Sequence, residues 1–104
     1  MEITLSGHQR KFLRGLAHAL KPIVRIGQMG VTAAVEQALD EALDTHELVK
    51  VKFNDDKSKA FKREALQQLE TVSGACMVGM IGHIGIFYRP HPDEEKRTIQ
   101  LPKA

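Results

Sequence analysis

The alternating stretch ELVKVKF (residues 47–53) constrains the fold of this 104-residue chain more than any other segment. Apolar and polar residues alternate along it, as in a β-strand whose two faces meet different surroundings. The alternation assigns two sets of side chains to opposite faces: Val49, Val51 and Phe53 on one, and Leu48, Lys50 and Lys52 on the other. Helical periodicity precedes the stretch from residue 32 and follows it over residues 54–74. Because strands separated by helices need crossover connections, the chain is predicted to form a mixed sheet.

A first helix is predicted over residues 5–22. Ser6 is its N-cap, and Gln9 completes a capping box. Pro22 ends the helix, since a proline disfavours helical backbone at the residue before it. Four side chains recur at spacings of four, four and three and predict one exposed basic stripe: Arg10, Arg14, His18 and Lys21.

The remaining elements complete an α/β fold. Residues 23–26 predict a short strand, and residues 75–81 and 84–89 predict two strands joined by a hairpin. Residues 1–90 are therefore expected to form one compact domain, with a four-stranded mixed sheet and three helices in the order α-β-α-β-α-β-β. Residues 91–104 form a polar, proline-marked tail, in which TIQL is a candidate edge strand.

The composition limits the kind of protein. Hydrophobic residues make up 42% of the chain, enough for one domain, and no apolar run approaches the roughly 20 residues of a membrane helix. The N-terminus lacks the basic and apolar regions of a secretory signal. With Cys76 as the single cysteine, an internal disulfide is excluded. We therefore expect a cytoplasmic protein without a membrane partner.

Charge is segregated along the chain although the net charge is only +2. Residues 1–30 carry five basic side chains and one acidic one, residues 31–49 carry five acidic and no basic ones, and residues 50–63 carry six basic and two acidic ones. Segregation of this kind can build a basic face for a polyanion. The alternative is that these are ordinary solvated helix faces.

The segment RIGQMGVT (residues 25–32) places Gly27-Gln28-Met29-Gly30 between a strand and a helix N-terminus. Glycine lets another backbone approach closely, and the free N–H groups and dipole of the helix favour a phosphate. In KH-type RNA modules such a G-x-x-G loop clamps a single-stranded backbone. The alternative is a tight turn that binds nothing. Two later G-x-x-G runs, at residues 79–82 and 82–85, precede no helix and are predicted to serve turns and close packing.

Three blocks of sequence carry a resemblance to a known family: LRGLAHALKPIVRIGQMGVT, ALDTHELVKVKF and GACMVGMIGHIGIFYRP. In this order, over roughly residues 5–90, they resemble the CRM (chloroplast RNA splicing and ribosome maturation) domain, and most closely its bacterial single-domain YhbY-type members. The resemblance implies a fold similar to the C-terminal domain of translation initiation factor 3. It also implies binding of ribosomal RNA in precursors of the large ribosomal subunit, and we expect the protein to be a monomer.

The resemblance also indicates a binding site. The family's glycine loop maps onto Gly27–Gly30, its lysine-bearing strand onto Lys50 and Lys52, and its terminal tyrosine-arginine onto Tyr88 and Arg89. Many relatives have a lysine where this chain has Gln28, which shifts weight onto flanking cations. Tyr88 is the best placed aromatic residue for stacking. The predicted RNA-binding residues are Gly27, Gln28, Met29, Gly30, Arg25, Arg10, Arg14, Lys21, Lys50 and Lys52.

Other chemistries find little support. The five histidines lack metal-ligand spacing, and Cys76 within an apolar strand predicts a buried thiol. Asp55 and Asp56 precede a helix, so one of them is expected to be an N-cap rather than part of a catalytic pair. We therefore predict no enzyme, metal or cofactor. A second hypothesis is a protein-interaction adaptor that docks through the acidic face of the helix beginning at residue 32 or through the tail.

Overall fold

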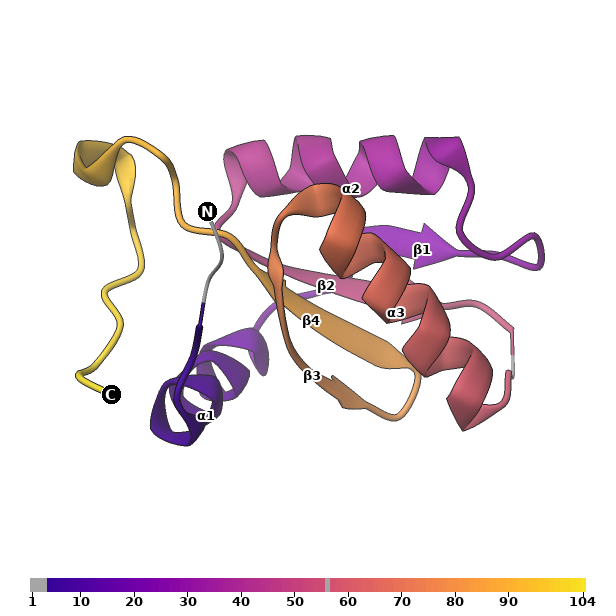
Figure 1. Cartoon of the computed structure of the whole chain (residues 1–104), viewed down its shortest axis with the longest axis horizontal. Helices are drawn as coiled ribbons and strands as arrows, with labels where there is room; N and C mark the ends of the chain where they lie inside the picture. Colours follow the sequence, from indigo (N-terminus) through magenta and orange to yellow (C-terminus); the bar gives the residue numbers. More distant parts are fainter. Residues whose placement is uncertain (1–3, 56) are drawn as a thin grey trace.

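The computed structural model describes residues 4–55 and 57–104 and confirms the predicted α/β class (Figure 1). Its elements are α1 (Gly7–Ala17), β1 (Val24–Ile26), α2 (Ala33–Thr45), β2 (Leu48–Phe53), α3 (Lys59–Ser73), β3 (Cys76–Ile81), β4 (Ile84–Tyr88) and a 3-10 turn, η1 (Glu94–Lys96). The strands form one sheet in the order β1-β2-β4-β3. β1 runs parallel to β2, and the other neighbours are antiparallel, so the sheet is mixed as predicted.

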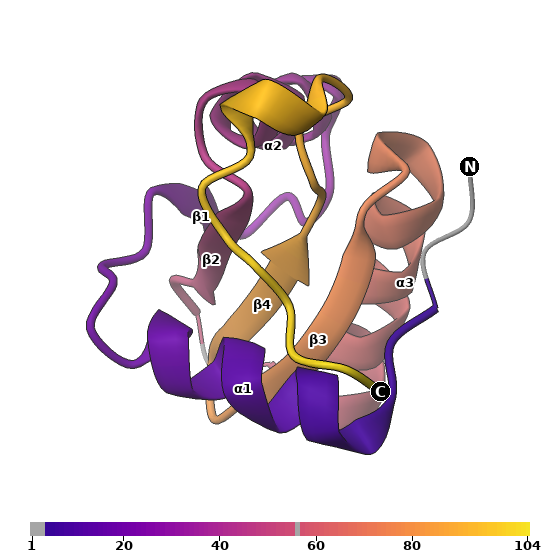
Figure 2. The same cartoon turned by 90° about the vertical axis from the view of Figure 1, so that its left-hand side faces the viewer.

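The sheet lies between two layers of helix, with α2 and α3 on one face and α1 on the other (Figures 1 and 2). The alternating side chains of β2 contribute to two hydrophobic clusters, one on each face of the sheet. Val49, Val51 and Phe53 pack in the cluster shared with α2 and α3, whereas Leu48 packs in the cluster shared with α1. The predicted assignment of the two faces is therefore confirmed.

Local signals set the ends of α1. The Ser6 hydroxyl accepts a hydrogen bond from Gln9 N–H at 3.1 Å, and the Gln9 carboxamide accepts one from Ser6 N–H at 3.0 Å, so the capping box is confirmed. The helix ends at Ala17, earlier than predicted, because its last turn tightens: His18 N–H reaches the carbonyls of Arg14 and Gly15. Lys21 therefore lies outside the helix.

Ser58 caps α3, since its hydroxyl accepts a hydrogen bond from Phe61 N–H at 3.1 Å. The expectation that Asp55 or Asp56 caps this helix is wrong for Asp55, and Asp56 lies outside the described residues. Gly85 confirms the prediction of close packing, because a Cβ built there would lie 2.6 Å from a methyl group of Leu66 on α3. A larger side chain would therefore push α3 away from the sheet.

The tail does not add a strand to the sheet. Residues 98–101 are irregular, because the N–H groups of Thr98 and Ile99 donate to the Glu47 carboxylate, at 2.6 and 2.9 Å, rather than to a neighbouring strand. Ile99 and Leu101 pack against the core on the α1 side. The tail thus passes from the C-terminal end of α2 down to α1 and covers one end of the sheet (Figure 2).

Candidate nucleic-acid interface

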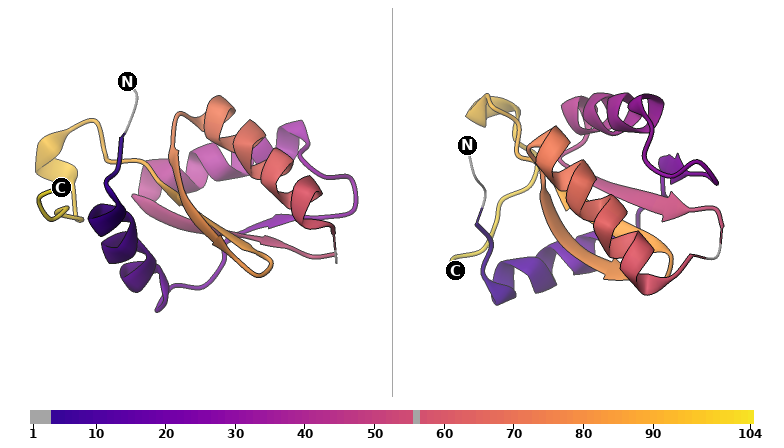
Figure 3. Two further views of the ribbon diagram at one scale, coloured as in Figure 1. Left: turned by 60° about the horizontal axis from the view of Figure 1, so that its bottom comes forward. Right: turned by 45° about the vertical axis from the view of Figure 1, so that its right-hand side comes forward.

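Three connections meet at the end of the sheet opposite the tail. β1 and β2 are parallel and finish there, and β4 begins there, so Asn54 N–H donates to the Ile26 carbonyl at 2.9 Å and Phe53 N–H to the His83 carbonyl at 2.8 Å. α2 and α3 also begin at this end (Figures 1 and 3). We call it the loop end: the glycine loop 27–30, the first turns of α2 and α3, and the hairpin turn 82–83. The end carrying the tail, Glu47 and Arg89 is the tail end.

The glycine loop is a turn closed by a 3.0 Å hydrogen bond from Gly30 N–H to the Gly27 carbonyl. Gln28 and Met29 form its exposed tip, and 85% of the Met29 surface is accessible. Gly30 is buried with φ of +74°, and a Cβ there would lie 3.4 Å from Phe61 Cζ, so the turn requires glycine at this position. Gly27 has no positive φ and open space around it, so the turn itself does not require glycine there.

The N-terminus of α2 follows the loop directly. The Thr32 hydroxyl accepts a hydrogen bond from Val35 N–H at 3.2 Å, and Glu36 N–H donates to the Thr32 carbonyl. Within the described part of the chain, the N–H groups of Ala33 and Ala34 have no acceptor. Together with the helix dipole, these two donors favour an anion beside the turn.

Two of the predicted cations lie next to the loop. Arg25 on β1 and Lys52 on β2 are partners in the parallel register, on the α1 side of the sheet. The Arg25 guanidinium is exposed, with one nitrogen 3.5 Å from the Asn54 carboxamide oxygen. Lys50 lies two residues back along β2, and its ammonium donates to the Leu20 carbonyl at 2.9 Å. Arg25 and Lys52 therefore present positive charge close to the glycine loop.

The predicted basic stripe on α1 is divided. The Arg10 guanidinium is half-buried and donates to the carbonyls of Met77 and Val78, at 2.7 and 3.2 Å, where a register shift interrupts the β3–β4 ladder. The prediction that Arg10 is exposed is therefore wrong, because it satisfies these irregular carbonyls instead. Arg14 and Lys21 are exposed, but α1, which carries Arg14, lies on the other face of the sheet from α2 and α3 (Figure 3), and Lys21 lies beyond the end of α1.

Other basic residues at the loop end were counted in the charge analysis but not assigned to the site. Lys59 and Arg63 are exposed on the first turns of α3, and the Lys57 ammonium lies 5.3 Å from the centre of the Phe61 ring. Lys62 is different: it is buried, and its ammonium donates to the Gly82 carbonyl at 3.2 Å. The density of lysine over residues 50–63 was the signal that could have added Lys57, Lys59 and Arg63 to the site.

The aromatic residue available at the surface is not the predicted one. Tyr88 is 3% exposed, and burial raises the pKa of its phenol. The prediction that Tyr88 stacks on RNA is therefore wrong, because β4 is central in the sheet and carries this side chain into the α1 core. Phe61, on the first turn of α3, is instead 38% exposed beside the glycine loop.

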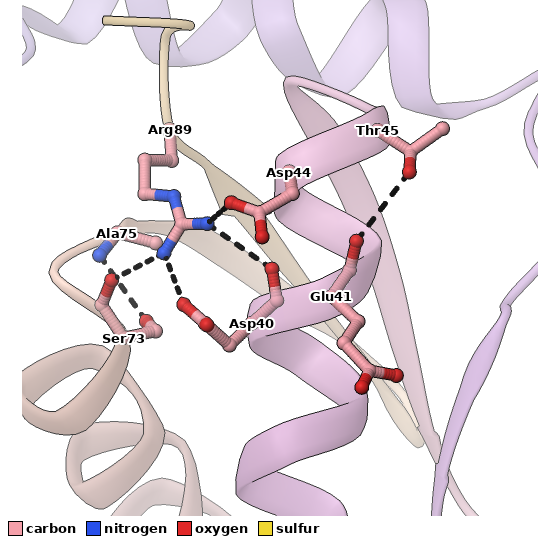
Figure 4. Close-up of polar contacts among 7 residues, drawn as sticks. All are labelled: Asp40, Glu41, Asp44, Thr45, Ser73, Ala75 and Arg89. Carbon is pink, nitrogen blue, oxygen red and sulfur yellow. Dashed lines mark hydrogen bonds and ion pairs between the residues drawn. The ribbon is translucent and has the colours of Figure 1, made fainter.

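Two acidic side chains of α2 pair with Arg89 at the tail end (Figure 4). The Arg89 guanidinium donates to the carboxylates of Asp40 and Asp44, at 2.8 and 2.9 Å, and to the Ser73 carbonyl at 2.8 Å. Arg89 therefore ties the ends of α2 and α3 to β4. Glu36 lies nearer the glycine loop, in the first turn of α2, where it accepts a hydrogen bond from Gln68.

The described residues hold no group of three histidine, cysteine, aspartate or glutamate side chains that could bind a metal. No helix among them is long and apolar enough to cross a membrane. Cys76 is buried as predicted, and burial raises the pKa of its thiol. The groups available for binding at the loop end are therefore exposed cations, free backbone N–H donors and one accessible aromatic ring.

Comparison with known proteins identifies the family. Residues 5–89 match the model of the CRS1 / YhbY (CRM) domain. The chain belongs to the CRM family. This CRM domain is 40% identical over 100 residues to a Haemophilus influenzae protein named "RNA-binding protein", covering 96% of this chain and 97% of the relative. It is 33% identical over 98 residues to "Probable RNA-binding protein YqeI" of Bacillus subtilis, covering 94% and 99%.

A solved structure shares the fold. The solution structure of SAV1595 from Staphylococcus aureus, described as a candidate RNA-binding protein, superimposes on this CRM domain with a TM-score of 0.81. The two chains are 30% identical, and the match covers 95% of this chain and all of the other. The family resemblance read from the three sequence blocks is thereby confirmed.

Proposed function

We propose that this CRM domain is a non-enzymatic, monomeric, cytoplasmic protein that binds ribosomal RNA in large-subunit precursors during ribosome assembly. The observation that carries the proposal is the Gly27–Gly30 turn with its exposed tip at Gln28 and Met29, which leads into the free N–H groups of Ala33 and Ala34. The relatives named as RNA-binding proteins support it.

The loop end can hold a phosphate from several directions. Without a side chain at Gly27, a phosphate can approach the turn and reach the N-terminus of α2. Arg25 and Lys52 supply positive charge on the α1 side of the sheet, and Lys59 and Arg63 supply it from α3. This arrangement suits the phosphate backbone of RNA, whose charge makes the dominant contribution to the affinity of proteins for nucleic acids.

A protein that recognises the RNA backbone is expected to bind many RNA sequences with similar affinity. Phosphate contacts orient a protein on a nucleic acid but carry no sequence information directly. Specificity for a large-subunit precursor would then come from RNA shape and from the assembling particle. The carboxylates of Asp40 and Asp44 lie toward the tail end and disfavour binding of the same polyanion there.

Crosslinking in cells tests this proposal. RNA crosslinked to the wild type and to an Arg25→Glu, Lys52→Glu variant would be sequenced side by side. We expect reads from large-subunit ribosomal RNA, with most of them lost in the variant at equal protein abundance. An adaptor held only by protein contacts would give few crosslinks with either protein, and its association with precursors would survive high salt.

A further inference from the structure

A hollow of about 200 Å³ lies between the glycine loop and α3. Met29, Gly30 and Val31 line it from the loop, and Phe61, Glu64 and Gln68 line it from the helix. Gly30 lies against the edge of the Phe61 ring, with 3.4 Å between the ring and the position a Cβ would take. Met29 and Gly30 therefore belong both to the Gly27–Gly30 turn and to the wall of the hollow.

The walls of the hollow are apolar groups left at the surface. Met29 is 85% and Phe61 is 38% exposed, although both are large hydrophobic residues. The Lys57 ammonium lies 5.3 Å from the centre of the ring. An ammonium on a flexible stem can move to a nearby phosphate and free the ring for another partner.

The far side of the hollow is polar. Glu64 provides carboxylate oxygens, and Gln68 provides a carboxamide whose nitrogen lies 3.3 Å from the Glu36 carboxylate. Apolar walls with a few convergent polar groups suit a flat ligand that has hydrogen-bonding groups on its edge. A nucleobase has this chemistry, and the Lys57 ammonium beside the Phe61 ring complements the charge of its phosphate.

We propose that an unpaired RNA base enters this hollow and stacks on Phe61 beside Met29, while its phosphate lies at the Gly27–Gly30 turn. This inference rests on the proposed function and narrows its ligand to single-stranded RNA. A base within a duplex is already paired and stacked, so it cannot reach the ring. Stacking of this kind tolerates different bases, since every base has a π-face.

The test uses two substitutions at one position. Phe61→Leu keeps an apolar side chain and removes the ring, whereas Phe61→Tyr keeps the ring. Dissociation constants would be measured by fluorescence anisotropy for a short single strand, for a duplex containing the same sequence, and for an abasic strand with the same number of phosphates. Thermal unfolding would be measured for each protein.

We expect Phe61→Leu to weaken binding of the single strand by about 5- to 100-fold, within the range of one base–aromatic stack, and Phe61→Tyr to bind as the wild type does. Duplex binding should be unchanged. The wild type should bind the abasic strand more weakly by a similar factor, and Phe61→Leu should no longer distinguish the two strands. The abasic comparison needs only the wild type, so it decides the matter even if a variant fails to fold.

Two outcomes would overturn the inference. One is equal affinity of the wild type for base-bearing and abasic strands, and the other is equal loss of single-strand and duplex binding in Phe61→Leu. The proposed function fails differently: Arg25→Glu with Lys52→Glu would then leave the affinity for every RNA unchanged. If that double variant has a lower affinity for every RNA, while the wild type binds base-bearing and abasic strands equally, the phosphate site is supported and the base-binding hollow is not.

Discussion

At the tail end, the side chains of Arg89 and Glu47 each take part in four hydrogen bonds, whereas at the loop end the side chains of Lys52, Lys59 and Arg63 make none to any described residue. The charged groups of the tail end are satisfied within the chain and hold elements together. At the loop end, Lys59 and Arg63 are exposed and Lys52 is partly exposed, close to free backbone donors. A charged side chain is therefore a candidate for binding a ligand when it has no partner within the chain, and its charge alone is not sufficient.

The largest expected effect is on stability and belongs to the tail end. Glu47→Ala removes the carboxylate that accepts hydrogen bonds from the N–H groups of His91, Thr98 and Ile99. We expect a loss of about 3 kcal/mol in the free energy of unfolding, since three donors lose a charged acceptor. Urea unfolding measures it. Glu41→Ala, at an exposed site on α2, is the control and should change stability little. RNA affinity of the folded Glu47 variant should be unchanged, and a large loss would contradict the separation of the two ends.

The next effect is on binding and belongs to the loop end. Gly27→Asp needs no positive φ and meets no atom within 4 Å, so stability should stay within about 0.5 kcal/mol. A carboxylate beside the bound phosphate should lower RNA affinity by about 10- to 100-fold. Gly7→Asp makes the same change at an open position on α1 and should leave affinity unchanged. Gly30→Asp is the less clean probe, because its positive φ adds about 1–3 kcal/mol of strain.

Free and tied cations can also be compared directly. Arg25→Ala and Lys52→Ala should each lower the salt slope for a single strand by about 0.7 and weaken binding several-fold, as phosphate contacts are lost. Arg10→Ala removes the same charge from a guanidinium that already holds two carbonyls of β3. Arg10→Ala should leave the salt dependence of RNA affinity unchanged and lower the free energy of unfolding. Titrations between about 50 and 200 mM salt would separate the two cases. Equal slopes for all three variants would mean that Arg25 and Lys52 touch no phosphate.

The same contrast explains how far the sequence could predict this molecule. Strand alternation in β2 and the Ser6–Gln9 capping box act over a few residues, so their consequences could be read locally. Arg10 is held by carbonyls 67 and 68 residues away, and Glu47 by N–H groups as far as residue 99. No periodicity reports such contacts. The glycine loop was predictable because strand, loop and helix are consecutive, whereas Phe61 joins it only through folding.

Acid should loosen the tail end before it affects the loop. Burial raises the pKa of Glu47, but hydrogen bonds from His91, Ile99 and Thr98 outweigh burial, so its pKa lies below the usual value of 4.5. A lowered pKa in the folded state means that this stabilisation is complete above about pH 4.5 and is lost as the pH falls through the folded pKa. Glu47→Gln should therefore show a flatter decline in stability below this pH. Urea unfolding at pH 7, 5, 4 and 3 tests it, and identical pH profiles for the two proteins would contradict the assignment.

The smallest expected effect is a gain at the loop end. Gln28 occupies the exposed tip of the glycine turn without a positive φ, so Gln28→Lys should fold as the wild type does. One more cation facing a phosphate should raise single-strand affinity by about two- to fivefold at low salt and add about 0.7 to the salt slope. Gln100→Lys, on the exposed tail, adds the same charge at the other end and serves as the control. Because both variants have the same net charge, a gain confined to Gln28→Lys would place the phosphate at the turn. Equal gains would mean that RNA responds only to the overall charge of the protein, and the contrast between the two ends would then carry no functional meaning.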